Sequence, residues 1–217
     1  MIIRIVAGGP EEQLPDLKAN FKGKEQWIGV DRGALYLLER DITPAKAFGD
    51  FDSITSDEWA RIAAAVPDYV QFPAEKDETD LEIALNAAIK QQPEAIFLYG
   101  VTGGRLDHFF GAVTLLMKKE LNCPVVIVDR QNEISIYSPG ETTVAQQEKW
   151  PYISFFALSE KVEGLTLSGF KFPLDNYTVE KGSSRCVSNE ILEKKGVFSF
   201  HSGILMVIRS CDGRRRH

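Results

Sequence analysis

The chain has 217 residues, 44% of them hydrophobic, which is enough for one large domain or two small ones with buried cores. Its formal net charge of -6 argues against nucleic acid as a partner, because binding the phosphate backbone requires a basic face. We expect no signal peptide and no membrane span, since no apolar run is long enough. Three dispersed cysteines, without a Cys-x-x-Cys pair, suggest the reducing cytoplasm.

Strand-like apolar runs alternate with helical patterns over the first part of the chain. The runs cover residues 2–7, 27–30, 45–48, 70–72, 95–99 and 125–128. Alternation of this kind predicts a mainly parallel sheet covered by helices. We therefore predict an α/β domain at residues 1–130.

Two helical segments carry an apolar stripe at the spacing of one helix face. The first stripe consists of Leu81, Ala84, Leu85, Ala88 and Ile89, and the second of Leu106, Phe109, Phe110, Val113 and Met117. We interpret both stripes as core. Upstream, Thr55 and Glu58 have the spacing of a capping box, which predicts a helix start there and leaves residues 50–53 in the preceding loop.

The pattern changes after about residue 130, where long helical stripes give way to short apolar runs. These runs cover residues 134–137, 153–157, 165–170, 197–200 and 205–208. Turn residues separate them at Pro139-Gly140, Glu163-Gly164, Asp175-Asn176, Gly182-Ser183-Ser184 and Ser202-Gly203. This spacing predicts an all-β domain, a small β-sandwich, at residues 131–217.

Polar turns follow each of the first five predicted strands. They are Gly8-Gly9, Asp31 with Gly33, Asp50 with Asp52, Lys76 to Asp80, and Gly103 to Asp107. Ligands of parallel sheets bind outside the carboxyl ends of the strands, so these turns should converge. Glycines let the backbone approach a phosphate, and carboxylates there need an intervening cation such as magnesium. The set predicts a magnesium and polyphosphate site.

Each turn also has a purely structural interpretation. Asp-x-Asp turns often only cap helices, and Asp77 and Asp80 could sit where a helix dipole favours them. Arg105 could equally form a surface ion pair. His108 and His201 are better interpreted as structural than as ligands, because neither has a second histidine at metal-binding spacing, so zinc hydrolysis is not expected.

The order and spacing of several motifs resemble those of the thiamine pyrophosphokinase family. In the first domain they are Asp31-Arg32-Gly33-Ala34, Gly49-Asp50-Phe51-Asp52-Ser53, Asp77-Glu78-Thr79-Asp80 and Gly103-Gly104-Arg105-Leu106-Asp107-His108. In the second they are Gly169-Phe170-Lys171-Phe172-Pro173-Leu174, Ser188-Asn189-Glu190, Phe198-Ser199-Phe200 and Gly203-Ile204-Leu205. The resemblance spans nearly the whole chain.

This resemblance implies transfer of a diphosphate from ATP to thiamine, giving thiamine diphosphate and AMP with magnesium. It implies Asp50, Asp52 and Asp80 as magnesium ligands, which with Arg105 form the catalytic set. It makes the domain at residues 1–130 the one that binds nucleotide and magnesium. Around the nucleotide and its phosphates it places Asp31, Gly33, Lys76, Asp77, Thr79, Arg105 and Asp107. It places Phe172, Ser188 and Asn189 against thiamine, and it implies a homodimer with the site between subunits, to which the β domain contributes.

Two other functions remain open from the residues. The run from Asp50 to Ile54 after an apolar strand also fits the opening motif of haloacid-dehalogenase-like phosphatases, although their later lysine and paired-acid turn are not found. A covalent aspartyl-phosphate would distinguish such an enzyme. A non-catalytic sensor could bind nucleotide or thiamine in the same pocket, but binding alone does not need several metal-ligating carboxylates.

Overall fold

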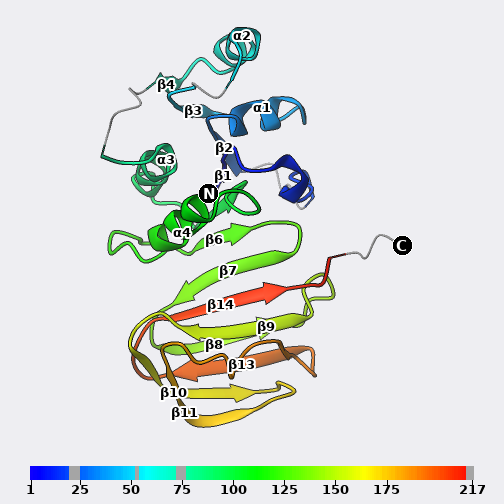
Figure 1. The fold of residues 1–217 in the computed structure, drawn as a ribbon, viewed down its shortest axis with the longest axis vertical. Helices are drawn as coiled ribbons and strands as arrows, with labels where there is room; N and C mark the ends of the chain where they lie inside the picture. Colours follow the sequence, from blue (N-terminus) through cyan, green and yellow to red (C-terminus); the bar gives the residue numbers. More distant parts are fainter. Residues whose placement is uncertain (20–24, 52–53, 72–76, 214–217) are drawn as a thin grey trace. The chain divides into compact units, whose positions relative to one another are not determined.

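The computed structural model describes residues 1–19, 25–51, 54–71 and 77–213 (Figure 1). The chain divides into two compact units, Met1–Arg130 and Gln131–His217. Within the described ranges, no helix has both the length and the apolar character needed to cross a membrane.

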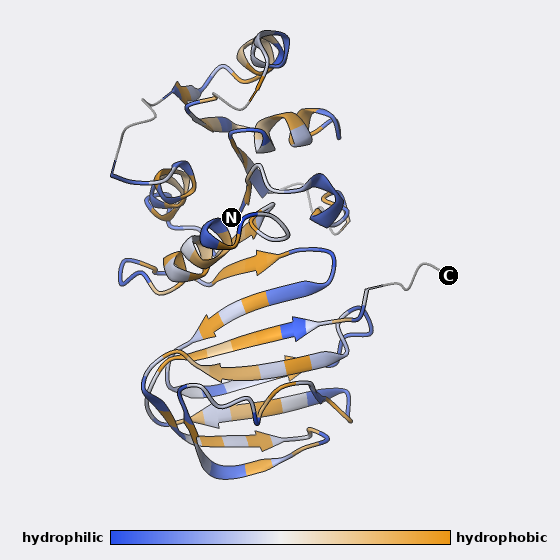
Figure 2. Ribbon diagram, in the orientation of Figure 1, coloured by the Kyte–Doolittle hydropathy of each residue, from blue (hydrophilic) through white to orange (hydrophobic). Residues whose placement is uncertain are grey.

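The first unit is built on a parallel sheet with strand order β6-β5-β1-β2-β3-β4. Its strands are β1 (Ile2–Val6), β2 (Glu25–Val30), β3 (Lys46–Gly49), β4 (Tyr69–Gln71), β5 (Ala95–Tyr99) and β6 (Val125–Val128). Parallel strands covered on both faces are apolar along their length, and Figure 2 shows this for β6. The predicted runs therefore lie where sheet strands form.

Helices cover both faces of this sheet. They are the short 3₁₀ helix η1 (Glu11–Gln13) and the α-helices α1 (Gly33–Leu38), α2 (Ser56–Ala65), α3 (Asp80–Ile89) and α4 (Leu106–Leu115). Figure 1 shows α3 and α4 on the side of the sheet opposite α1. Since the chain moves outward from β1 to β4 and then returns to β5, right-handed crossovers require this change of face.

The predicted start of α2 is confirmed. The Thr55 hydroxyl accepts the backbone N–H of Glu58, and the Glu58 carboxylate accepts the backbone N–H of Thr55 at 2.8 Å. This reciprocal pair satisfies donors that would otherwise lack partners at the helix end. Asp50 accordingly lies ahead of the helix.

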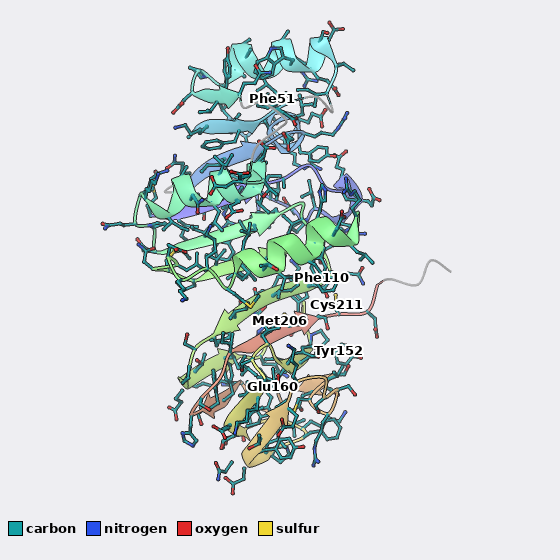
Figure 3. All side chains as sticks on the ribbon, turned by 60° about the vertical axis from the view of Figure 1, so that its left-hand side comes forward. Phe51, Phe110, Tyr152, Glu160, Met206 and Cys211 are labelled. Carbon is teal, nitrogen blue, oxygen red and sulfur yellow. The ribbon has the colours of Figure 1, made fainter. Side chains whose placement is uncertain are left out.

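The two predicted helix stripes fare differently. In α3 four of the five predicted core residues, Ala84, Leu85, Ala88 and Ile89, are buried, and Leu81 is half-buried. In α4 the prediction is wrong for most of the stripe, since Leu106 is 72%, Phe110 64% and Met117 41% exposed, and Phe110 can be found on α4 in Figure 3. Val113 of the predicted stripe is buried, and the rest of the buried face consists of Ala112, Leu115 and Leu116. An apolar helix offers several stripes of equal spacing, and packing selects one of them.

The second unit is a β-sandwich, which together with the parallel sheet confirms the predicted fold class. One antiparallel sheet has the order β12-β9-β14-β7 and the other β11-β10-β13-β8. The strands are β7 (Asn132–Tyr137), β8 (Gly140–Ala145), β9 (Tyr152–Ala157), β10 (Lys161–Ser168), β11 (Leu174–Glu180), β12 (Asn189–Glu190), β13 (Lys195–Phe200) and β14 (Leu205–Ser210).

The sandwich core is centred on aromatic rings. Phe155 and Phe198 are fully buried, with ring centroids 5.4 Å apart, and Phe170 packs on Phe155 at 5.6 Å. Both contacts are edge-on, the geometry that the ring quadrupoles favour. Residues of both sheets thus share one core.

Two of the predicted turns are wrong. Glu163-Gly164 lies inside β10 and Asp175-Asn176 inside β11. Gly164 and Asn176 have positive φ angles of 75° and 46°, and the register between β10 and β11 shifts between Val162 and Leu167. The turn-forming residues here accommodate irregular pairing within continuous strands, as β-bulges do.

Candidate active site

The loops that follow β1 and β5 are interlocked at the carboxyl edge of the parallel sheet. The backbone N–H of Gly9 donates to the carbonyl oxygen of Gly100 at 2.8 Å. A Cβ atom on Gly9 would lie 2.4 Å from that oxygen, and a Cβ atom on Gly100 would lie 2.2 Å from the carbonyl oxygen of Ala7. Only glycines allow this approach, which leaves a backbone-lined surface at the edge.

The loop after β2 meets the loop after β3. Asp31 has a φ of 49°, its backbone N–H donates to Phe48 at 2.8 Å, and its carboxylate lies against Gly49. Gly33 begins α1 directly over the carbonyl oxygen of Val6, where a Cβ atom would come within 1.9 Å. Asp31 and Gly33, two of the residues predicted around the nucleotide, are therefore neighbours at one edge of the sheet.

The loop after β3 also reaches β4. Asp50 is half-buried, and its carbonyl oxygen accepts the side-chain amide of Gln71 at 3.3 Å. The predicted ligand Asp52 and the predicted phosphate contact Lys76 lie outside the described residues. In the described ranges, no group of three His, Cys, Asp or Glu side chains is placed to hold a metal ion.

The start of α3 contains three more predicted residues. The Thr79 hydroxyl accepts the backbone N–H of Glu82 at 3.2 Å, so it caps the helix. Asp80 is the first residue of α3 and is half-buried, whereas Asp77 is exposed. Since α3 runs back from β4 to the start of β5, its N-terminus lies at the carboxyl edge of the sheet, where it offers free N–H groups to an anion.

Arg105 and Asp107 form an ion pair at the start of α4. Two guanidinium nitrogens contact the two carboxylate oxygens, at 2.6 Å and 3.1 Å. Hydrogen bonding by Arg105 lowers the pKa of Asp107 to about 2. Both side chains are largely exposed, so the structural interpretation of Arg105 as a surface pair holds in this structure, and the guanidinium remains accessible.

Two of the three residues predicted around thiamine line a cavity of about 340 Å³ in the sandwich. Phe172, which is 58% exposed, and Asn189, which is 3% exposed, both line it. Ser188, which directly precedes Asn189, is not a lining residue; it has a φ of 56° and donates its backbone N–H to the Ser154 hydroxyl at 2.9 Å. The remaining lining residues are Leu167, Lys171, Pro173, Leu174, Arg185, Cys186 and Val187.

Comparison with known proteins identifies both units. The family model for the thiamin pyrophosphokinase catalytic domain matches residues 17–127, and the model for the vitamin B1 binding domain of the same enzymes matches residues 141–205. A curated thiamine pyrophosphokinase from Bacillus subtilis is 47% identical over 97% of this chain and 99% of its own length. The chain belongs to the thiamine pyrophosphokinase family. The family and the kind of enzyme predicted from the motifs are confirmed.

Solved structures of thiamine pyrophosphokinases share the fold of this chain. The crystal structure from Bacillus subtilis has a TM-score of 0.93 at 46% identity and covers 98% of this chain and 100% of its own. The structure from Geobacillus thermodenitrificans has a TM-score of 0.91 at 48% identity and covers 99% of both chains. The thiamine pyrophosphokinase fold therefore extends over nearly all of the sequence.

Sequence reasoning missed several polar groups beside these two regions. Arg185 lines the sandwich cavity and lies over the Tyr177 ring at 4.7 Å, but the sequence predicted only a turn just before it, at Gly182-Ser183-Ser184. Thr102, in the loop after β5, has a buried hydroxyl with no hydrogen-bond partner among the described residues. Its position between a strand end and Gly103-Gly104 was the available signal.

Proposed function

We propose that this chain transfers the diphosphate group of ATP to the hydroxyl of thiamine, giving thiamine diphosphate and AMP. The observation that carries the proposal is the succession of a catalytic-domain match and a vitamin B1 binding-domain match along one chain. The interlocked glycine loops supply a phosphate-binding edge in the first, and the cavity beside Phe172 supplies a ring-binding pocket in the second. The reaction needs both a phosphate-binding edge and a ring-binding pocket.

The α/β unit would hold the nucleotide. Backbone N–H groups at the starts of α3 and α4 favour phosphate oxygens through the helix dipoles. Arg105 adds a guanidinium that can neutralise charge developing on the transferred group. Asp31 and Gly33 would lie beside the nucleotide, with Lys76, Asp77, Thr79 and Asp107 near it. Thr79 would contact the nucleotide through its hydroxyl, which also caps α3.

Magnesium would be held by Asp50, Asp52 and Asp80. Carboxylate oxygens are the ligands magnesium prefers, and Asp50 and Asp80 are both half-buried at loops or helix starts of the carboxyl edge. When bound, the ion would neutralise phosphate charge during transfer. The chain's own part would be to hold these carboxylates at the carboxyl edge of the sheet.

Thiamine would occupy the sandwich cavity against the exposed face of Phe172. An aromatic face attracts a cation, and thiamine carries a positive thiazolium ring. Ser188 and Asn189 complete the predicted set. We further propose a cytoplasmic homodimer with the site at the subunit interface, and the three free cysteines suit a reducing compartment.

The test is incubation of the pure chain with magnesium, ATP and thiamine, followed by separation of nucleotides and thiamine species. We expect AMP and thiamine diphosphate in equal amounts. The Asp50→Asn and Asp52→Asn variants should each lose this activity by about 100-fold or more, because magnesium would lose a charged ligand.

Asp57→Asn is the matched control, since Asp57 is an exposed aspartate in the first turn of α2, close in sequence to both ligands. It should retain wild-type activity. Formation of ADP or free phosphate would instead favour an ordinary kinase or the phosphatase, and a trapped aspartyl-phosphate would establish the latter. Binding of ATP or thiamine without any turnover would favour the sensor.

A further inference from the structure

The loop that carries Phe172 runs alongside the segment that contains Asn189. The backbone N–H of Lys171 donates to Glu190 at 2.8 Å, and the backbone N–H of Leu192 donates to Gly169 at 3.0 Å. These bonds flank an antiparallel bridge between Phe170 and Ile191, so the loop forms a short ladder with the end of β12 and the residues after it. The ladder has no backbone partner for residue 172, at the point where the loop turns into the cavity wall.

The side-chain amide of Asn189 completes this ladder. Its Oδ1 atom accepts the backbone N–H of Phe172 at 3.0 Å, and its Nδ2 atom donates to the Phe172 carbonyl oxygen at 2.9 Å. Oδ1 also accepts the backbone N–H of Glu190 at 2.9 Å. A carboxamide offers a donor and an acceptor side by side, so it imitates the peptide group that a further strand residue would provide.

Asn189 is itself held in place. Its backbone pairs with Ile153 of β9, and the preceding residue Ser188 adopts a left-handed conformation anchored on Ser154, which is buried. Asn189 is 3% exposed, and both lone pairs of its oxygen are used. By contrast, the ring of Phe172 is largely exposed, and Lys171 lies over it at 5.7 Å while pairing with Glu190 at 2.6 Å.

We propose that Asn189 is a positioning residue that fixes Phe172 for thiamine through the peptide of residue 172, rather than a direct thiamine contact. This proposal rests on the proposed function, because it takes Phe172 as the thiamine contact. An exposed ring on an unanchored loop would have to be ordered each time the substrate binds. Because the side-chain amide of Asn189 already holds the backbone of residue 172, this ordering cost is smaller when thiamine binds.

A double-mutant cycle on the full chain tests the proposal. Asn189→Ala and Phe172→Ala should each raise KM for thiamine by about tenfold, with kcat and KM for ATP changed less than about twofold. The double variant should be no worse than Phe172→Ala alone, since Asn189 acts through that residue. Additive effects of the two substitutions, or an unchanged KM in Asn189→Ala, would overturn the proposal.

Asn189→Asp provides a second and sharper variant. It preserves size and the two accepted bonds, but it places a charged oxygen against the Phe172 carbonyl. A positioning role predicts a raised KM for thiamine, whereas a direct contact with this cationic substrate predicts a lowered KM, because a negative charge would attract it. If Asn189→Ala does not fold, this variant alone and in the Phe172→Ala background decides the outcome.

The two proposals fail in different ways. A wild-type chain that forms no thiamine diphosphate would overturn the proposed function and this inference with it. An active wild-type chain with additive variants would overturn the positioning role and leave the proposed function intact. Thermal unfolding of each variant, at midpoints within a few degrees of the wild type, would show that the kinetic changes arise at the site.

Discussion

The loops of the α/β unit and the loop of Phe172 are held by opposite means. At the carboxyl edge of the parallel sheet, Gly9, Gly33 and Gly100 let backbones touch because they have no side chain. In the sandwich, the loop of Phe172 is held because Asn189 has a side chain with both a hydrogen-bond donor and an acceptor. Added atoms should therefore disturb the glycine loops, whereas removal of atoms from Asn189 should disturb the loop of Phe172.

The two arrangements differ in what a change should affect. Gly33 lies over β1 in the centre of the sheet, so any added atom disturbs the folded core of the unit. Phe172 lies in an exposed loop beyond β10, so a change there should affect ligand binding more than folding. Substitutions can test this division between folding and binding.

The largest effect is expected in the sandwich core. Phe155→Ala removes a fully buried ring that contacts Phe170 and Phe198, and it should lower the free energy of unfolding by about 3–5 kcal/mol. Urea denaturation measures this. Phe172→Ala is the matched control in the same unit, and it should stay within about 0.5 kcal/mol of the wild type. A comparable loss of unfolding free energy in both variants would contradict this separation of residues that affect folding from residues that affect binding.

Gly33→Ala should come next. Its Cβ atom would lie 1.9 Å from the Val6 carbonyl oxygen, which is backbone and cannot rotate away, so α1 or β1 must shift. We expect a loss of about 3 kcal/mol in unfolding free energy, at the upper end of the usual cost of overpacking. Urea denaturation followed by far-ultraviolet circular dichroism measures it. An unchanged midpoint would show that the loops tolerate added atoms.

A smaller effect is expected at the start of α3. Thr79→Ala removes a helix cap and should cost about 1 kcal/mol, as should Thr55→Ala at the start of α2. If Thr79 also contacts the nucleotide, Thr79→Ala should raise KM for ATP several-fold, whereas Thr55→Ala should not. Thr79→Ser keeps the hydroxyl and should restore both properties. Equal KM values in the two alanine variants would reduce Thr79 to a cap.

A glycine outside the interlocked loops should behave in the opposite way. Gly111 lies in the middle of α4, and a Cβ atom there would meet nothing within 4 Å. Gly111→Ala should therefore stabilise the chain by about 0.5–1 kcal/mol through helix propensity. Thermal unfolding measures the gain. Destabilisation would indicate that this exposed face is covered in solution.

Much of the fold follows from local patterns. The alternation of apolar strands and helices predicts the parallel sheet, and Thr55 with Glu58 predicts the start of α2, because both signals act within a few residues. The buried face of α4 could not be predicted, since Leu106 and Phe110 are as apolar as the residues that packing selects. The turn signals of Gly164 and Asn176 do not distinguish a chain reversal from a bulge.

The candidate site likewise has features that sequence patterns predict and features that they do not. Asp31, Gly33 and Gly100 converge because the carboxyl ends of parallel strands share an edge, a rule that sequence reasoning can apply. Asn189 was predicted against thiamine from its motif, but its bonds to residue 172 join segments 17 residues apart in the chain. No periodicity reports such a pair. Long-range contacts of single side chains are therefore where prediction from sequence ends.

The smallest expected effect concerns the ion pair that opens α4. Because Arg105 holds the pKa of Asp107 at about 2, below its ordinary 3.8, Asp107 should stay ionised in the folded chain as the pH falls from 4 toward 2. The stabilisation from this depressed pKa is present above the unfolded-state value and is lost as the pH falls through about 2. Carbon-13 NMR of the carboxyl group measures the titration, and Arg105→Gln should return it toward 3.8. Adding ATP should raise the pKa of Asp107 as well, since phosphates that bind the guanidinium draw it away from the carboxylate. A titration that ATP leaves unchanged would remove Arg105 from the phosphate site and leave the edge to its backbone groups.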